Sequence, residues 1–591
     1  MKKLMLIIGF LMVISTAYAV KADPTPAVVQ QPDGTMLTVV LHGDEHCNWY
    51  STLDGVLLVQ TPKGYYVAET ADDGELVATS TLAHNANQRT TNELRMIQKQ
   101  NKARFFEVAQ ATTSARRALS IGTATPAYFP HSGSPKALVI LVEFKDTLFS
   151  VSNPKQTFDD YLNSMETLVD YGACENRNYG SVRQYFSDMS DGQFTPVFDV
   201  YGPVRLDSAS GYYGKGTSDT YYRKMISEAC AAVDDSVDFS QYDANGDGYV
   251  DLVYIIYAGY SASVSGNSVD CLWPKSGSGS FGTYDGVSVR RFGINNELNY
   301  SPKKQFSEAP YKRVNGIGLF CHEFSHTLGL PDIYPTSSSA QVDNQAMEYW
   351  DVMDGGEYTD GGYTPTPYTP WEREVMGWIS IESLTDTAQV TLKPLNDGGK
   401  AYRIESDNAK EYLIVENVQN TGWATYLYGH GMLVHRICYT KTSVNLGDNP
   451  NNTKGKPAVT LVPADSILIT SYRVYSSLSD SSATKPWSKD EYIQSHYGDP
   501  FPGTTGRDSL VSVTLNNTTL EKPIYNITEE DGVITFDFLK RNSDVTAIAL
   551  PTTTGVATDE RIFTIDGRYV GTRVDALPKG IYIRNGKKIV R

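Results

Sequence analysis

Two histidines one helical turn apart, with a glutamate directly after the first, constrain this chain of 591 residues more than any other feature. The segment contains His322, Glu323 and His326. Residues at i and i+4 lie on one face of a helix, where both imidazoles can bind one tetrahedral metal ion. Glu323 then projects beside the ion, where it can act as general base toward a water that the metal activates.

The residues after this helix complete the predicted metal site. Gly329 permits a left-handed turn that ends the helix, and Pro331 prevents the helix from resuming. The chain can therefore return and present Asp332 as a third ligand. Two histidines and one carboxylate leave a fourth position open, which is typical of catalytic zinc. The alternative, an ordinary helix with two satisfied histidines, is disfavoured because the chain has only nine histidines.

The first 22 residues have the pattern of a secretory signal peptide. A short positive stretch, Met1-Lys2-Lys3, precedes an apolar run from Leu4 to Val13. Ala17-Tyr18-Ala19 and Val20-Lys21-Ala22 are the two candidate cleavage sites. We therefore expect a secreted or cell-surface protein without a transmembrane span, and an uncleaved membrane anchor is the alternative.

Residues 23–117 form a first block that we interpret as a propeptide. Segments 36–41, 56–59 and 64–68 read as short strands, and the polar stretch 85–102 as a helix. A dibasic pair, Arg116-Arg117, precedes a Pro/Ser/Gly-rich linker. This organisation predicts a zymogen, and a permanently attached accessory domain is the alternative.

Three further regions follow the linker. Residues 136–385 combine apolar strands at 137–144 and 249–258 with helices beginning near 181 and 220, so we expect a catalytic domain of the α/β or, as we favour, the α+β class. Residues 386–540 have strand after strand and predict a β-sandwich. Residues 555–591 carry the hairpin pairs Asp566-Gly567 and Asn585-Gly586, which predict a short C-terminal β segment.

An Asp/Gly-rich loop within the catalytic region predicts a structural calcium site. Oxygen-bearing side chains stand at loop positions 1, 3, 5 and 9, which are Asp243, Asn245, Asp247 and Asp251. Gly248 stands at position 6, and the carbonyl of Tyr249 is available at position 7. This is the first part of an EF-hand loop. Position 12 is Tyr254 instead of glutamate, and a turn without an ion is the alternative.

Charge and cysteine usage exclude several classes of partner and site. The net charge is −17 and the isoelectric point about 5.0, whereas a nucleic-acid-binding protein needs a basic footprint. The six cysteines show no CxxC pair, which argues against zinc-ribbon and thioredoxin-like sites. Cys47, next to His46, is a candidate cap of the zinc in the latent state. Cys321, His430 and His435 are expected to be structural.

The zinc motif and the sequence after it resemble a known family. The stretch 321–334, followed by Met353 in the turn-rich segment 349–356, has the metzincin pattern and resembles the immune inhibitor A family of secreted metallopeptidases, peptidase family M6. The resemblance implies a metzincin-like fold, endopeptidase activity on proteins, and Met353 as a hydrophobic base under the metal. Tyr363 and Tyr368 are candidates for stabilising the oxyanion, against a simple packing role.

The predicted function is that of a secreted zinc endopeptidase, made as a zymogen, that hydrolyses extracellular proteins with Glu323 as general base. A surface adhesin with a degenerate enzyme domain and a zinc hydrolase acting on another substrate are the alternatives. The last 30 residues, for example Leu577 to Tyr582, resemble C-terminal sorting segments of Bacteroidetes exoproteins, which implies a secretion machinery as partner. A plain terminal hairpin is equally compatible with them.

Overall fold

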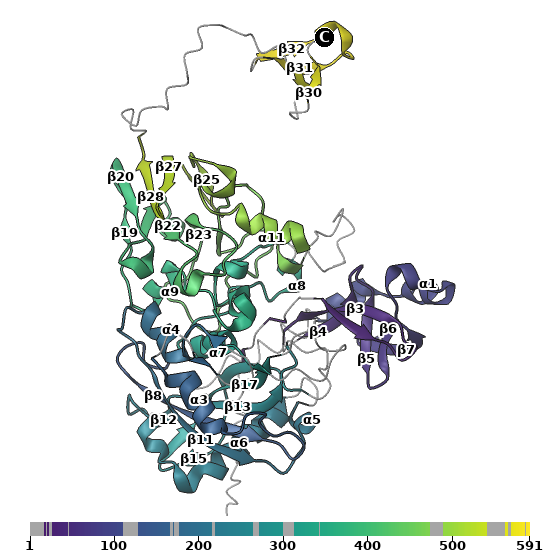
Figure 1. Ribbon diagram of the computed structural model, residues 1–591, viewed down its shortest axis with the longest axis vertical. Coiled ribbons are helices and arrows are strands. Elements are labelled where there is room, and N and C mark those ends of the chain that lie inside the picture. Colours follow the sequence, from purple (N-terminus) through teal and green to yellow (C-terminus); the bar gives the residue numbers. More distant parts are fainter. Residues whose placement is uncertain are drawn as a thin grey trace, which may run out of the picture. The chain divides into compact units, whose positions relative to one another are not determined.

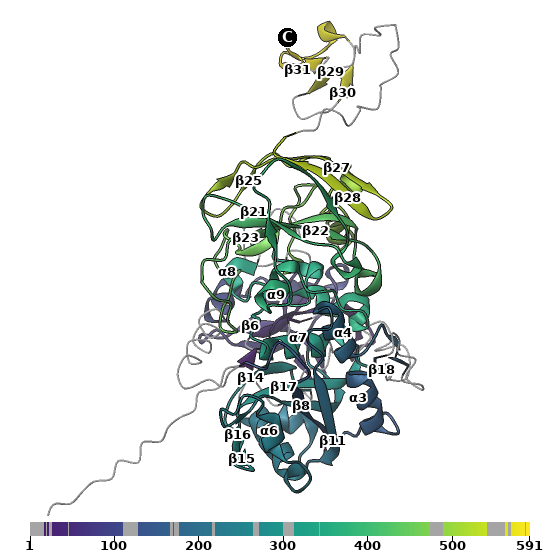
Figure 2. The same ribbon diagram turned by 90° about the vertical axis from the view of Figure 1, so that its left-hand side faces the viewer.

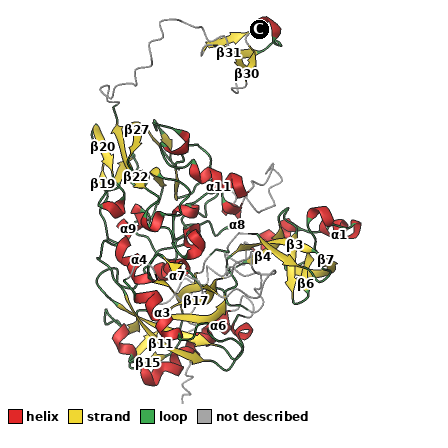
Figure 3. Cartoon of the chain, viewed as in Figure 1, coloured by secondary structure: helices red, strands yellow, loops and turns green. Residues whose placement is uncertain are grey.

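The chain forms two compact units, residues 1–541 and 542–591. The computed structural model (Figures 1 and 3) describes residues 17–18, 21–22, 26–44, 47–109, 128–165, 169–170, 177–214, 219–263, 271–299, 313–341, 343–472, 489–540, 562–564, 569–571, 573–584 and 587–591. Most of the predicted signal peptide, the pair Arg116-Arg117 and both C-terminal turn pairs lie outside these residues.

The N-terminal block is an antiparallel sheet of six strands in sequence order. Its strands are β2 (Ala27–Gln30), β3 (Met36–Gly43), β4 (Asn48–Thr52), β5 (Leu57–Thr61), β6 (Gly64–Thr70) and β7 (Leu76–Leu82). Helix α1 (Thr91–Ile97) is shorter than predicted, because the side chain of Thr90 caps it and it ends at Gln98. Lys21 and Ala22 are also buried, so we use "N-terminal block" for residues 21–109.

The region predicted to be catalytic is built on one mixed sheet in the order β1-β14-β17-β13-β8-β11. Strands β11, β8, β13 and β17 run parallel, and β14 is antiparallel to β17. The bounds are β1 (Ala17–Tyr18), β8 (Lys136–Glu143), β11 (Val197–Arg205), β13 (Val253–Tyr260), β14 (Lys275–Ser278) and β17 (Arg291–Asn299), and β18 (Arg313–Val314) pairs with the end of β17.

Helices cover both faces of this sheet (Figure 1). Val139 and Leu141 of β8 pack in one core with α3 (Pro154–Asn163), α4 (Val182–Met189) and α7 (Gly318–Thr327), whereas Leu138 and Ile140 pack in a second core with α6 (Asp219–Val233). Alternate residues of a strand point to opposite faces, so a continuous apolar strand fits this arrangement. Of the two classes expected, α/β and α+β, the structure has the mixed α/β one, since parallel strands require crossover helices.

The predicted strand 249–258 is interrupted. Tyr249–Val250 forms β12, which pairs with β16 (Val287–Val289) in a separate small sheet, and β13 begins only at Val253. The side chain of Asp251 turns back and accepts the amide of Ala244 at 3.0 Å. A polar side chain that bonds its own loop competes with the strand ladder, which explains the break.

The region after residue 380 is rich in strands, as expected (Figures 2 and 3). One sheet contains β19 (Glu382–Ser383), β21 (Tyr402–Glu405), β22 (Tyr412–Val418), β23 (Gly431–Ile437) and β24 (Val459–Leu461). A second contains β20 (Ala388–Leu392), β28 (Val533–Phe538) and β27 (Ile524–Glu530). Leu392, Val415 and Phe536 from the two sheets share one core.

The second unit is a sheet in the order β30-β29-β31-β32 around Ile562, Leu577 and Tyr582. Its strands are β29 (Ile562–Thr564), β30 (Tyr569–Gly571), β31 (Ile581–Arg584) and β32 (Lys587–Val590).

Shorter elements complete the described chain. They are β9 (Val169–Asp170), β10 (Arg177–Asn178), α5 (Ser210–Tyr213), β15 (Thr283–Tyr284), α8 (Ser338–Gln341), α9 (Pro370–Val375), α11 (Lys489–Tyr497), β25 (Val513–Thr514) and β26 (Thr519–Leu520). None of the described helices is long and apolar enough to cross a membrane.

Candidate metal centre

Helix α7 carries the two histidines in the interior of the catalytic domain. All ten of its residues, Gly318–Thr327, are buried. Gly318 lies against the loop at Glu357, where a Cβ on residue 318 would stand 2.1 Å from the carbonyl oxygen of Glu357. Only glycine allows this close approach. The rings of His322 and His326 lie with their centroids 4.8 Å apart.

A Schellman motif ends α7 and directs the chain toward the third ligand. Gly329 has a φ of +100°. Its amide donates to His326 O at 3.0 Å, and the amide of Leu330 donates to Ser325 O at 3.2 Å. These are the two bonds that define this helix end. The left-handed turn predicted at Gly329 is therefore present, and Asp332 follows it three residues later.

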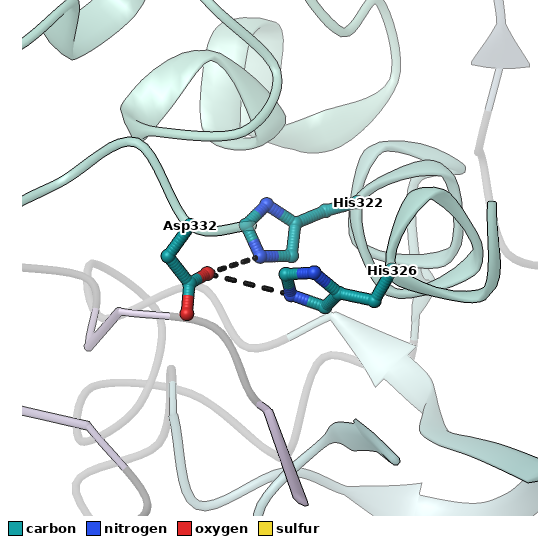
Figure 4. A group of neighbouring side chains, drawn as sticks. All are labelled: His322, His326 and Asp332. Atoms are coloured by element: carbon teal, nitrogen blue, oxygen red, sulfur yellow. Dashed lines mark ion pairs between the residues drawn. The ribbon is translucent and has the colours of Figure 1, made fainter. Parts of the chain in front are cut away.

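The three predicted ligands converge (Figure 4). Oδ1 of Asp332 lies 3.3 Å from Nε2 of His322 and 3.4 Å from Nε2 of His326. A tetrahedral zinc with bonds of ~2.0–2.1 Å places its ligand atoms about 3.4 Å apart. Across the described residues, this is the one group of three or more His, Cys, Asp and Glu side chains placed to hold a metal ion, with ligand atoms within 4.8 Å of one another.

Backbone carbonyls fix how the two imidazoles point. Nδ1 of His322 bonds Val352 O and Nδ1 of His326 bonds Leu330 O, both at 2.8 Å. A carbonyl can only accept, so each Nδ1 carries the proton and each Nε2 presents a lone pair to the shared space. Within the described part of the chain, Nε2 of His322 and Oδ1 of Asp332 have no hydrogen-bond partner. This donor set fits zinc.

The electrostatics of the site also suit a bound cation. Burial lowers the pKa of His322, so its imidazole is held neutral. Burial would raise the pKa of Asp332, but His326 and His322 outweigh it and hold the pKa well below its usual range. The site therefore offers a carboxylate and a neutral imidazole, the protonation states in which both groups bind metals.

Glu323 lies fully buried on the same helix. Burial, and then the carboxylate of Glu323, raise the pKa of Tyr254, a residue of β13. The carboxylate of Glu323 is therefore close enough to Tyr254 to interact with it electrostatically.

The segment around Met353 supports the site through its backbone. Met353 is fully buried, its carbonyl accepts the amide of Ile333 at 3.0 Å, and its amide donates to Oδ1 of Asp351 at 2.7 Å. Val352 holds His322, as described above. One turn thus fixes both the first histidine and the chain next to Asp332, and the role of the Met353 side chain as a hydrophobic base under the metal stays a prediction.

A buried pair of carboxyl groups lies behind this turn. Burial raises the pKa of Glu372 to about 7, and burial together with the nearby Glu372 raises the pKa of Asp351 well above its ordinary range. Glu372 also closes a capping box with Thr369 at the start of α9. The sequence analysis missed this pair, although the Thr-x-x-Glu spacing of the capping box was visible.

The two tyrosines that were candidates for stabilising the oxyanion have hydrogen-bond partners outside the metal group. The hydroxyl of Tyr363 donates to Val314 O at 2.7 Å, and the hydroxyl of Tyr368 bonds Ser325. Neither contact belongs to the metal group.

The remaining cysteine and histidine candidates have structural surroundings. Cys47 packs beside Trp49 in the N-terminal block, and Cys321 is buried in the core. His435 bonds Glu416, and His430 bonds Glu529, in the β-rich region.

The N-terminal block contacts the turn at Met353 through ion pairs and a hydrogen bond of Lys21, which no sequence pattern predicted. The ammonium of Lys21 lies 3.4 Å from Asp354 Oδ1 and 3.5 Å from Glu348 Oε2. The carbonyl of Lys21 accepts the hydroxyl of Tyr358 at 2.8 Å. Lys21 and Asp354 are 333 positions apart in the sequence, so no local pattern connects them.

The predicted calcium loop is an exposed turn with its own hydrogen bonds. Asp243 accepts the amides of Asp247 and Gly248 at 3.0 and 2.9 Å, and Asp247 accepts that of Tyr249 at 3.0 Å. Asp251 is buried; burial, with the neighbouring Asp243 and Asp247, raises its pKa to about 6. The loop is therefore folded, and its negative charges lie close enough to repel one another.

The segment that carries this site is similar to the catalytic domains of known metallopeptidases. A family model described as immune inhibitor A peptidase M6, catalytic domain, matches residues 128–378. The chain is 26% identical over 306 residues to immune inhibitor A of Bacillus thuringiensis subsp. alesti, covering 44% of this chain and 42% of the relative. It is 25% identical over 292 residues to the pre-pro-metalloprotease PrtV of Vibrio cholerae serotype O1, covering 42% and 31%. The chain thus spans less than half the length of these relatives.

Proposed function

The chain contains a catalytic domain of the immune inhibitor A peptidase M6 family, and from this premise we propose that it is a secreted zinc endopeptidase acting on extracellular proteins. The observation that carries the proposal is the convergence of His322, His326 and Asp332 within 4.8 Å. Two nitrogens and one oxygen leave a coordination position for substrate chemistry, whereas structural zinc sites are closed by four protein ligands.

In this proposal His322 and His326 hold the metal through Nε2 and Asp332 holds it through Oδ1. A bound zinc supplies Lewis acidity, which polarises the scissile carbonyl and lowers the pKa of water. Glu323 takes the proton from the attacking water and delivers it to the leaving amine. The carbonyls of Val352 and Leu330 keep both rings in the tautomer that binds metal, and burial excludes bulk solvent from the reacting groups.

Metal removal tests this function. We expect a chelator to abolish cleavage of a broad peptide library, and one equivalent of zinc to restore it. An Asp332→Asn variant keeps the size of the side chain but loses the negative charge beside the two Nε2 atoms, and we expect it to bind zinc more weakly. Cleavage that persists in fully demetallated protein would contradict the proposal.

We also propose that the N-terminal block is a propeptide and that signal peptidase cleaves after Ala19, which removes the two-residue strand β1 from the edge of the sheet. Lys21 is buried, and the amide of Ala22 donates to Gly43 O at 2.8 Å, so both residues belong to the folded block. His322, Glu323 and His326 have no exposed surface in the full chain, which supports a latent precursor. The boundary therefore moves from residue 22 to residue 19 in this proposal.

For the loop 243–251 we propose a calcium ion that relieves the repulsion among its carboxylates. We expect millimolar calcium to raise the thermal midpoint of the full chain, because a ligand that binds only the folded state stabilises it. An Asp247→Asn variant should show a smaller shift. An unchanged midpoint in the wild-type protein means that the loop is a plain turn.

The C-terminal unit, residues 542–591, is separate from the rest of the chain in its contacts. We propose that its β segment, predicted at 555–591, is recognised by a secretion machinery. Its independence as a compact unit supports this role.

A further inference from the structure

One lysine of the N-terminal block, Lys21, is buried among residues of the catalytic and β-rich regions. The side chain of Lys21 is 5% exposed, and its ammonium lies between Glu348, 1% exposed, and Asp354, 0% exposed. It also donates to Ser471 Oγ at 2.6 Å and lies 4.6 Å from the ring centroid of Tyr472. Lysine is rarely buried without such partners. The cation is therefore held by a complete set of anionic, hydroxyl and aromatic groups.

The pocket that receives Lys21 is held together by bonds that do not involve Lys21. Oδ2 of Asp354 accepts the amides of Met347 and Glu348 at 3.1 and 2.7 Å. The two oxygens of Glu348 accept the hydroxyl of Tyr492 at 2.8 Å and the amide of Ser471 at 3.2 Å. Both carboxylates are thus positioned by the catalytic and β-rich regions alone, and they are preorganised for a cation.

This pocket and the metal centre share one turn of the chain. Val352 holds His322 and Met353 holds Ile333, and Asp354, the next residue, holds the cation. On the other side, the ring centroid of Tyr334, two residues after Asp332, lies 5.9 Å from the ammonium of Lys21. The pocket is therefore lined by residues that neighbour Asp332 and the turn that supports His322 in the sequence.

We propose that Lys21 occupies the pocket with which the released catalytic domain selects a lysine side chain of its substrate. This inference rests on the proposed endopeptidase function and on removal of the N-terminal block. In the latent chain Lys21 fills the pocket, as a substrate lysine does later. When the block leaves, Glu348 and Asp354 lose their cation in a buried site, where an unpaired charge is strongly unfavourable. A substrate lysine restores the pairing, whereas a neutral side chain leaves both acids unpaired.

The test compares peptides that differ at one position. The full chain, activated by proteolytic removal of the N-terminal block, is given quenched peptides identical except for lysine, methionine or glutamate beside the scissile bond. We expect kcat/KM to be about 10²-fold or more higher for the lysine peptide than for the methionine peptide, because a pocket with buried polar groups rejects ligands that leave them unpaired. The glutamate peptide should be cleaved most slowly.

Two further arms separate the possible failures. In the activated Glu348→Gln protein, the ratio of kcat/KM for the lysine peptide to kcat/KM for the methionine peptide should fall about tenfold or more. A peptide of residues 20–26 should inhibit the wild-type enzyme better than the same peptide with Lys21→Met. In the uncleaved chain, Lys21→Met should raise residual activity, and Lys63→Met, an exposed lysine of the same block, should not. Equal cleavage of the lysine and methionine peptides by the active wild-type enzyme overturns this inference. Absence of any cleavage overturns the endopeptidase function instead.

Discussion

Replacing Glu323 by alanine should reduce kcat/KM for peptide cleavage by about 10²–10⁴-fold, the usual contribution of a general base. Glu323 is fully buried on the helix that carries both histidines, and we assign it no role as a metal ligand. The loss should therefore come with an unchanged zinc content of one ion per chain. Steady-state cleavage of a quenched peptide and metal analysis of the same preparation measure the two quantities.

A Glu323→Gln variant and a surface control sharpen this result. Glutamine keeps the size of the side chain but cannot take the proton, so it should be almost as inactive as alanine. Glu382→Ala removes an exposed carboxylate in β19 and should behave as the wild type. A Glu323→Ala protein that keeps zinc and more than a tenth of wild-type activity would remove Glu323 from the mechanism.

The metal centre could be predicted from sequence because the signals that build it are local. The i, i+4 spacing determines that His322 and His326 share a helix face, and the offset of Gly329 determines where that helix ends. The structure has both features, with Asp332 at the predicted distance along the chain. Each step depends on backbone hydrogen bonds spanning a few residues, and such bonds leave a recognisable residue pattern.

The parts that sequence did not predict depend on contacts between distant segments. The mixed sheet brings β14 antiparallel against β17, whereas β17, β13, β8 and β11 run parallel, and the residue pattern of a strand does not indicate its direction. The carbonyls of Val352 and Leu330 orient the histidines through backbone atoms, which carry no residue identity. Lys21 has no local feature that sets it apart from an exposed lysine. These features follow from tertiary packing, so a single sequence does not reveal them.

An aromatic core packs against α7 and supports the metal centre. The ring of Phe324, next to Glu323, is fully buried. Its centroid lies 5.3 Å from those of Phe129 and Phe198 and 5.1 Å from that of Phe186. Edge-on contacts of this kind add to the burial energy of each ring. Phe324 thus helps to pack the helix that holds the histidines against α4 and β11.

Phe324→Ala should therefore destabilise the catalytic domain by about 3–5 kcal/mol, the range for large-to-small changes at buried phenylalanines. The denaturation midpoint, followed by the fluorescence of Trp378, which stacks on Phe194 at 5.8 Å, should fall clearly, and zinc affinity should fall with it because α7 loses its fixed position. Leu148→Ala, at a side chain 49% exposed, should change stability by less than about 0.5 kcal/mol. If Phe324→Ala unfolded at the wild-type midpoint and bound zinc normally, the ligands would have to be held by the backbone contacts of Val352 and Leu330 alone.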